Sequence, residues 1–219
     1  MALLRRFPVV LLALGAIAGT AGTAFAQEPL QSAATTSTTS GQTTTSDVGK
    51  FLGGAALALG AHESGHLLFD AIFDSNPGIE KVSFHGIPFF AITHDSGLPH
   101  RQEFVIDSAG FWVQEATNEL LLVKRPNLRH EQAPLLKGMF AFNVIASFAY
   151  AGAAFAGTGP DERDTRGMAE AIRWKEPYVG LLILAPAILD TVRFYKPDAK
   201  WAAAGSRAAK VFSVVLIVR

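Results

Sequence analysis

The pattern of apolar and polar positions predicts a chain built mainly from helices. Helical periodicity covers residues 51–73, 103–123, 138–156, 178–195 and, more weakly, 201–219. Between the first two helices, apolar and polar residues alternate around Gly86, and this predicts two short strands and a turn within residues 79–93. Residues 157–177 are polar and charged, so we expect an exposed connection there.

The first 50 residues have a different character. Residues 1–26 contain Arg5 and Arg6, an apolar stretch and a small-residue ending at Ala26, which is typical of a cleaved secretory signal peptide. A retained membrane anchor is the alternative. Residues 27–50 are rich in Ser and Thr and lack the side chains needed for a core, so they predict a disordered linker. This leaves residues 51–219 as one domain.

Composition indicates a membrane protein. Hydrophobic residues make up 49% of the chain and charged residues only 17%, which is apolar for a soluble domain of 219 residues. The net charge is zero and no basic run includes aromatic residues, which argues against a nucleic-acid partner. We therefore expect a polytopic membrane helix bundle of three to four spans, with a small β-hairpin after the first span.

The distribution of Lys and Arg bears on the orientation of this bundle. Cleavage of the signal peptide leaves the linker on the outer side of the membrane. With four spans, more Lys and Arg residues then lie outside than inside, and the balance reverses if residues 103–123 do not cross. We therefore expect three full crossings of a bacterial-type inner membrane, with residues 103–123 lying partly in the interface.

The candidate chemistry lies in the middle of the first apolar helix. His62 and His66 are four positions apart, so on a helix their rings project to the same side and can bind one cation. In an HExxH motif the two imidazoles hold Zn²⁺ and the glutamate, here Glu63, accepts a proton from a zinc-bound water. The alternatives are a core helix with hydrogen-bonded histidines, or a zinc site without catalysis.

A catalytic zinc site needs a third protein ligand and one open position. The chain has no cysteine, so this ligand must be His, Asp or Glu. Asp190, a carboxylate in a late apolar helix, is the first candidate, and pairing with Arg193 is its alternative role. Glu119 is the second candidate and would give a thermolysin-like peptidase with a site nearer the surface; Asp107 is the third.

Other polar residues in the apolar helices are candidates for supporting roles. Asp70 could orient His66, or could mark the wet end of its helix. Three amide side chains could line a water-filled cavity or bind an oxyanion, and could equally serve helix packing: Gln114, Asn118 and Asn143. We expect the loop histidines to be solvated: His85, His94 and His100.

Several segments together carry a family resemblance. They are AHESGH at residues 61–66, the strand-like stretch after it, SAG at residues 108–110 and Leu-Asp at residues 189–190. With these features the chain resembles the site-2 protease family of intramembrane zinc metalloproteases. The resemblance implies zinc held by His62, His66 and Asp190, with Glu63 as the base that activates water. The substrate would be a protein or peptide in or near the lipid bilayer.

The chain departs from the pattern of this family at three places. Thr191 stands where a glycine usually follows the aspartate, Phe111 stands where a proline is common, and residues 138–156 form an additional helix.

A non-catalytic zinc-binding membrane protein, with a structural or partner-binding role, would not need Glu63. A membrane di-iron oxygenase would need many more than the 6 histidines present.

Overall fold

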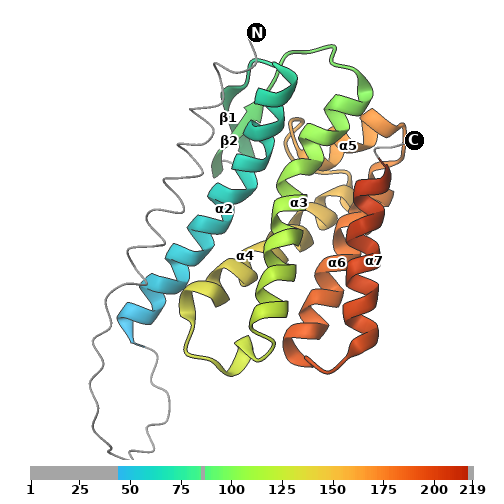
Figure 1. Cartoon of the computed structure of the whole chain (residues 1–219). Helices are drawn as coiled ribbons and strands as arrows, with labels where there is room; N and C mark the ends of the chain where they lie inside the picture. Colours follow the sequence, from blue (N-terminus) through green and yellow to red (C-terminus); the bar gives the residue numbers. More distant parts are fainter. Residues whose placement is uncertain (1–43, 85–86, 217–219) are drawn as a thin grey trace, which may run out of the picture.

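The computed structural model describes residues 44–84 and 87–216 and is mainly helical (Figure 1). The elements follow one another as α2 (Thr45–Phe73), β1 (Gly78–Phe84), β2 (Ile87–Thr93), α3 (His100–Lys124), the short 3-10 helix η2 (Leu128–His130), α4 (Pro134–Ala156), α5 (Asp164–Ile172), α6 (Glu176–Tyr195) and α7 (Lys200–Val215). Helix α2 packs against α3 and α4, and α6 packs against α4 and α7. The expectation of a mainly α fold is confirmed.

The first helix begins earlier than the apolar pattern predicts. Thr44 caps α2: its hydroxyl accepts a hydrogen bond from the backbone N–H of Asp47 at 3.2 Å, and the Asp47 carboxylate accepts one from the backbone N–H of Thr44 at 3.3 Å. This capping box satisfies backbone donors at the helix start. The predicted linker is therefore too long, because residues 45–50 are helical. The predicted signal peptide and the rest of the linker lie outside the described residues.

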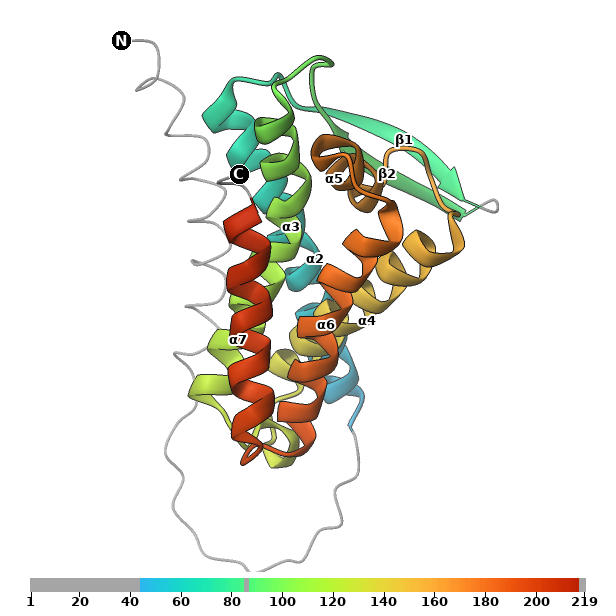
Figure 2. The same cartoon turned by 90° about the vertical axis from the view of Figure 1, so that its right-hand side faces the viewer.

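The predicted hairpin is confirmed. Strands β1 and β2 pair antiparallel, with Gly78 opposite Thr93 and Phe84 opposite Ile87. The hairpin runs along one side of the bundle, past α5 (Figure 2). The C-terminal end of β2 thereby reaches the neighbourhood of α2 and α3.

Two glycines allow α2 and α4 to cross closely. A Cβ atom on Gly54 would overlap the backbone of Leu135, and a Cβ on Gly138 would overlap the backbone of Phe51. Each glycine thus lies against the main chain of the opposite helix. Small residues at helix crossings are common where helices pack without a water-driven hydrophobic effect, as in membranes.

Helices α4 and α6 are long and apolar enough to cross a membrane, judged by length and composition. They are the two such helices in the described part of the chain, so the expected three to four spans are not confirmed. Helix α2 contains the ionisable residues of the candidate site, and α3 carries polar residues along its length, which lowers the hydropathy of both.

The segment 157–177 is more ordered than expected. It contains α5, whose side chains Thr165, Met168 and Ala169 are buried. Met168 belongs to a core cluster that includes Phe104 of α3 and Val179 of α6. The prediction of an exposed connection is wrong here, because one face of this short amphipathic helix packs against α3 and α6 and covers their shared core.

Candidate metal centre

His62 and His66 project side by side from the buried face of α2. Their exposed fractions are 3% and 4%. The two Nε2 atoms are 3.2 Å apart, as expected for residues one helical turn apart. The predicted pairing of the imidazoles on one face is therefore present.

The third group beside the histidines is Asp164, in the first turn of α5. Its Oδ2 atom is 3.3 Å from Nε2 of His62 and 3.6 Å from Nε2 of His66. Among the described residues, these three side chains form the group whose potential metal-ligand atoms all lie within 4.8 Å of one another. Asp164 is 102 positions from His62, so only the fold brings them together.

The spacing of these atoms fits a zinc ion. With zinc bonds of about 2.0–2.1 Å to N and O, neighbouring ligands of a tetrahedral site lie about 3.3 Å apart. The three observed separations are 3.2, 3.3 and 3.6 Å. Two imidazoles and one carboxylate also leave one position of a four-coordinate site open for water or substrate.

A hydrogen bond fixes which nitrogen of His66 is free. Its Nδ1 lies 2.8 Å from the backbone carbonyl oxygen of Ile106, which can only accept, so Nδ1 carries the proton. In the neutral imidazole, the lone pair is then on Nε2, which faces His62 and Asp164. Metal-binding histidines typically have such a partner on the second nitrogen, and it holds the ring in orientation.

Helix α3 lies directly against α2 at the Ser-Ala-Gly segment. A Cβ on Gly65 of α2 would overlap the backbone of Ala109, and a Cβ on Gly110 would overlap the ring of His62, 2.6 Å from Nδ1. The lack of a side chain at Gly110 therefore makes room for the imidazole. This gives the segment a packing role directly beside the site.

Tyr150 of α4 completes the surroundings of Asp164. Its hydroxyl interacts with the Asp164 carboxylate closely enough to lower the pKa of that group, and its ring stacks near His62 with centroids 6.1 Å apart. Burial alone would raise the pKa of Asp164, but its interactions with His66, His62 and Tyr150 outweigh burial and lower the pKa. Asp164 is therefore a carboxylate at neutral pH and can bind a cation.

Glu63 lies next to the three groups on α2. It is half-buried and close enough to His62, His66 and Asp164 to interact with their charges. A polar cavity of about 210 Å³ opens beside the site, between β2, α3 and α5. Its lining includes His66, Thr93, His94, Asp107 and Asp164, so the cavity offers a path for water or a peptide to His66 and Asp164.

Asp190 lies elsewhere. Its Oδ1 accepts hydrogen bonds from Arg193 at 3.0 Å and Ser206 at 2.6 Å, and its Oδ2 is 2.7 Å from Nζ of Lys210. This is the pairing with Arg193 that the sequence offered as the alternative, extended by Lys210 from α7. A carboxylate that neutralises two cations in this core is not beside the histidines, so Asp164 replaces Asp190 as the candidate third ligand.

The two lower-ranked candidates also lie outside the three-residue group. Glu119 pairs with Arg193, Arg207 and Lys210 and so belongs to the same charged network as Asp190. Asp107 does line the cavity next to Asp164.

The residues expected in supporting roles mainly serve packing. Asp70 accepts a hydrogen bond from Ser75 at 2.5 Å and lies 3.9 Å from His94. These contacts hold the residues that follow α2 against its last turn. Asn143 of α4 donates to Asn118 of α3 at 2.9 Å and to the backbone carbonyl of Gln114 at 3.4 Å. These two hydrogen bonds join α3 to α4, and none of the three residues is among those that line the cavity.

The sequence pattern does not point to Asp164, because residues 157–177 are polar and charged and predict an exposed connection. The available signal was the sequence DTRGMAEAI, in which an acidic residue precedes Met168, Ala169, Ala171 and Ile172 at helical spacing.

No protein-family model, curated protein or solved structure matches this chain.

Proposed function

We propose that this chain is a membrane-embedded zinc metallopeptidase in which His62, His66 and Asp164 hold the metal and Glu63 is the general base. The observation that carries the proposal is the convergence of three ligand atoms from α2 and α5, within 4.8 Å of one another, directly beside the glutamate of an HExxH motif. The resemblance to site-2 proteases supports the same reaction class, with the third ligand supplied by α5.

A bound Zn²⁺ would supply Lewis acidity, which polarises a peptide carbonyl and lowers the pKa of water. Glu63 would take the proton from the attacking water and pass it to the leaving nitrogen. Its half-buried position one residue from His62 suits this role, because the carboxylate is close to His62, His66 and Asp164 without belonging to the group of three ligand atoms.

The cavity suggests how a substrate would approach. Ile92 and Thr93, at the end of β2, line it together with His66. An extended peptide could add to a strand edge through main-chain hydrogen bonds and so reach the site in the conformation that peptidases require. Helices α4 and α6, the two candidate spans, would hold the site at or within the bilayer.

A zinc-binding membrane protein without catalysis is the second candidate. Its supporting observation is that the three ligands join two elements 102 positions apart, so a metal would also cross-link the fold. The two proposals differ in their need for Glu63, which a purely structural site does not use.

The test is proteolysis by detergent-purified protein loaded with zinc, using fluorescein-labelled casein as the probe. We expect Glu63→Gln to keep its zinc and lose cleavage by about 10²–10⁴-fold, the usual contribution of a general base. Glu131→Gln is the matched control, since Glu131 forms a surface pair with Arg125 far from the site. Cleavage by Glu63→Gln at the wild-type rate would exclude the proposed base, and zinc binding without cleavage in the wild type would favour the structural alternative.

A further inference from the structure

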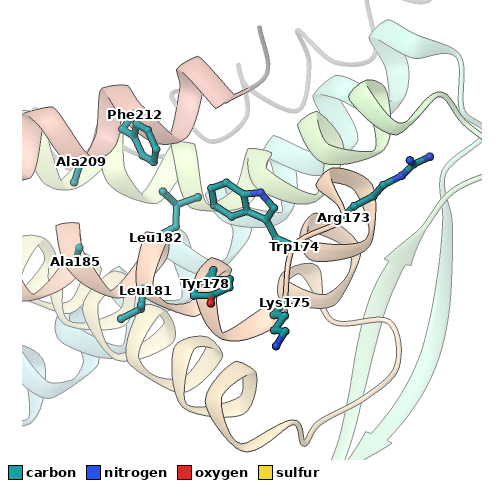
Figure 3. A pocket seen from close by; sticks show the side chains of 9 residues that line it. All are labelled: Arg173, Trp174, Lys175, Tyr178, Leu181, Leu182, Ala185, Ala209 and Phe212. Atoms are coloured by element: carbon teal, nitrogen blue, oxygen red, sulfur yellow. The ribbon is translucent and has the colours of Figure 1, made fainter. Parts of the chain in front are cut away.

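A second cavity lies away from the metal centre, in a groove between α6, α7 and the α5–α6 connection. Its volume is about 640 Å³. One end is basic and aromatic, and the rest is apolar (Figure 3). The lining residues are Arg173, Trp174, Lys175, Tyr178, Leu181, Leu182, Ala185, Ala209 and Phe212.

The apolar part of this groove is open. Tyr178, Leu181 and Phe212 are 55%, 54% and 52% exposed. Contiguous exposed apolar side chains of this kind mark contacts with a partner or with lipid. Because Leu181 and Tyr178 belong to α6, one of the two candidate spans, acyl chains are the medium that this surface would face.

The other end of the groove has uncompensated positive charge. Arg173 and Lys175 are exposed, and neither forms an ion pair with a residue in the ranges 44–84 and 87–216. The two nearest acidic residues in the sequence are already used: Glu170 accepts from Arg166 at 2.9 Å, and Glu176 accepts from Arg163 at 2.6 and 2.7 Å. Their side chains project in different directions in Figure 3, and each of these free cations can bind an anion.

Trp174 and Tyr178 lie between the basic and the apolar parts (Figure 3). Their rings form an edge-to-face pair with centroids 6.4 Å apart. Trp and Tyr are enriched at the headgroup level of membranes because their rings are apolar and carry one polar group. Along the groove the surface thus changes from basic to aromatic to apolar, which matches the order of headgroup, glycerol region and acyl chain in a phospholipid.

The geometry points to this groove as a binding site for one anionic phospholipid. The phosphate-containing headgroup contacts Arg173 and Lys175, the glycerol region lies at Trp174 and Tyr178, and an acyl chain follows Leu181 and Phe212 between α6 and α7. The inference rests on the membrane location in the proposed function and is independent of zinc and of peptidase activity.

The test uses Trp174 as the reporter. The full chain is placed in phosphatidylcholine nanodiscs that contain either brominated phosphatidylglycerol or brominated phosphatidylcholine, and bromine quenches nearby tryptophan fluorescence. The same measurement on Trp174→Phe isolates the contribution of Trp174. We expect Trp174 to be quenched at lower mole fractions of phosphatidylglycerol than of phosphatidylcholine, by about fivefold for each basic residue.

The variant Arg173→Gly/Lys175→Gln removes the charge with little risk to the fold. Arg173 has a φ of 56°, a left-handed conformation that glycine adopts without strain. We expect the double variant to lose the preference for phosphatidylglycerol and to keep its zinc content. The matched control is Lys124→Gln/Lys200→Gln, which removes two exposed lysines at the end of α3 and the start of α7 and should leave the preference unchanged.

Three results would overturn this inference while leaving the proposed membrane location in place. The first is equal quenching of Trp174 by both lipids in the wild type, and the second is a preference that survives in Arg173→Gly/Lys175→Gln. The third is that neither brominated lipid quenches Trp174 and that two copies of the chain can be cross-linked to each other at position 174. This result would mean that a second copy of the chain covers the groove. Failure of the wild type to float with phosphatidylcholine vesicles would overturn the membrane location itself as well as the lipid site.

Discussion

The Nε2 atom of His62 lies 3.3 Å from Oδ2 of Asp164, although 102 positions separate the two residues. This contact ties the HExxH helix α2 to the short helix α5. It supplies the carboxylate that a zinc site built on His62 and His66 requires, from a segment that the sequence pattern did not single out.

Replacing Gly110 with alanine should disturb the site through His62. The new Cβ would lie 2.6 Å from Nδ1 of His62 and would push the ring away from Asp164. We expect zinc affinity, measured by chelator competition, to fall by about 10–100-fold. The matched control is Gly152→Ala, where a Cβ meets no atom of the described chain within 4 Å. Unchanged affinity in Gly110→Ala would contradict the observed contact.

Replacing Tyr150 with phenylalanine should weaken metal binding without unfolding the protein. The change removes the hydroxyl that interacts with the Asp164 carboxylate and keeps the ring contacts with His62 and Phe111. We expect zinc affinity to fall by about tenfold, with an unchanged unfolding temperature in the metal-free protein. Tyr178→Phe removes an exposed hydroxyl far from the site and serves as the control. If both variants bind zinc equally well, Tyr150 does not position Asp164.

The α2–α4 crossing should be sensitive to one added methyl group. Gly54→Ala places a Cβ against the backbone of Leu135, where no side chain can move aside. We expect the free energy of unfolding in detergent to fall by about 1–3 kcal/mol. Gly53→Ala, one residue earlier, adds the same methyl group where no described atom lies within 4 Å, and it should be neutral or stabilising. Equal stability of the two variants would argue against this close approach.

Removing the Asp190 carboxylate should affect stability. Asp190→Ala leaves Arg193 and Lys210 buried with less compensating charge, since Glu119 remains their acidic partner. Loss of one member of a buried ion pair costs about 3–5 kcal/mol, which a chemical denaturation experiment in detergent would measure. Asp198→Asn, at an exposed position before α7, is the control. A loss below about 1 kcal/mol in Asp190→Ala would show that the network contributes little.

The sequence predicted those features that depend on local spacing. The pairing of His62 with His66 follows from helical geometry, and the hairpin follows from alternation around Gly86. Both needed no knowledge of how distant segments pack. The helical character of α3, α4, α6 and α7 was predicted for the same reason.

The carboxylate that lies beside the two histidines could not be predicted in this way. Asp190 is a candidate ligand by sequence because it is a carboxylate in an apolar helix. In the structure Arg193 and Lys210 neutralise its charge. The position of Lys210 depends on how α7 packs, which the local pattern does not show. Asp164 lies in a helix of 9 residues, too short for its periodicity to stand out from a polar loop. Which carboxylate meets the histidines is therefore decided by tertiary packing.

The most direct test of the account is the zinc content of folded, detergent-purified protein by mass spectrometry, for the wild type, His62→Ala, Asp164→Ala and Asp190→Ala. We predict about one zinc per chain in the wild type and in Asp190→Ala, and loss of zinc in His62→Ala and Asp164→Ala. Retention of zinc by Asp164→Ala together with its loss from folded Asp190→Ala would contradict the proposed ligand set. Absence of zinc from the wild type after metal supplementation would contradict the metal centre as a whole.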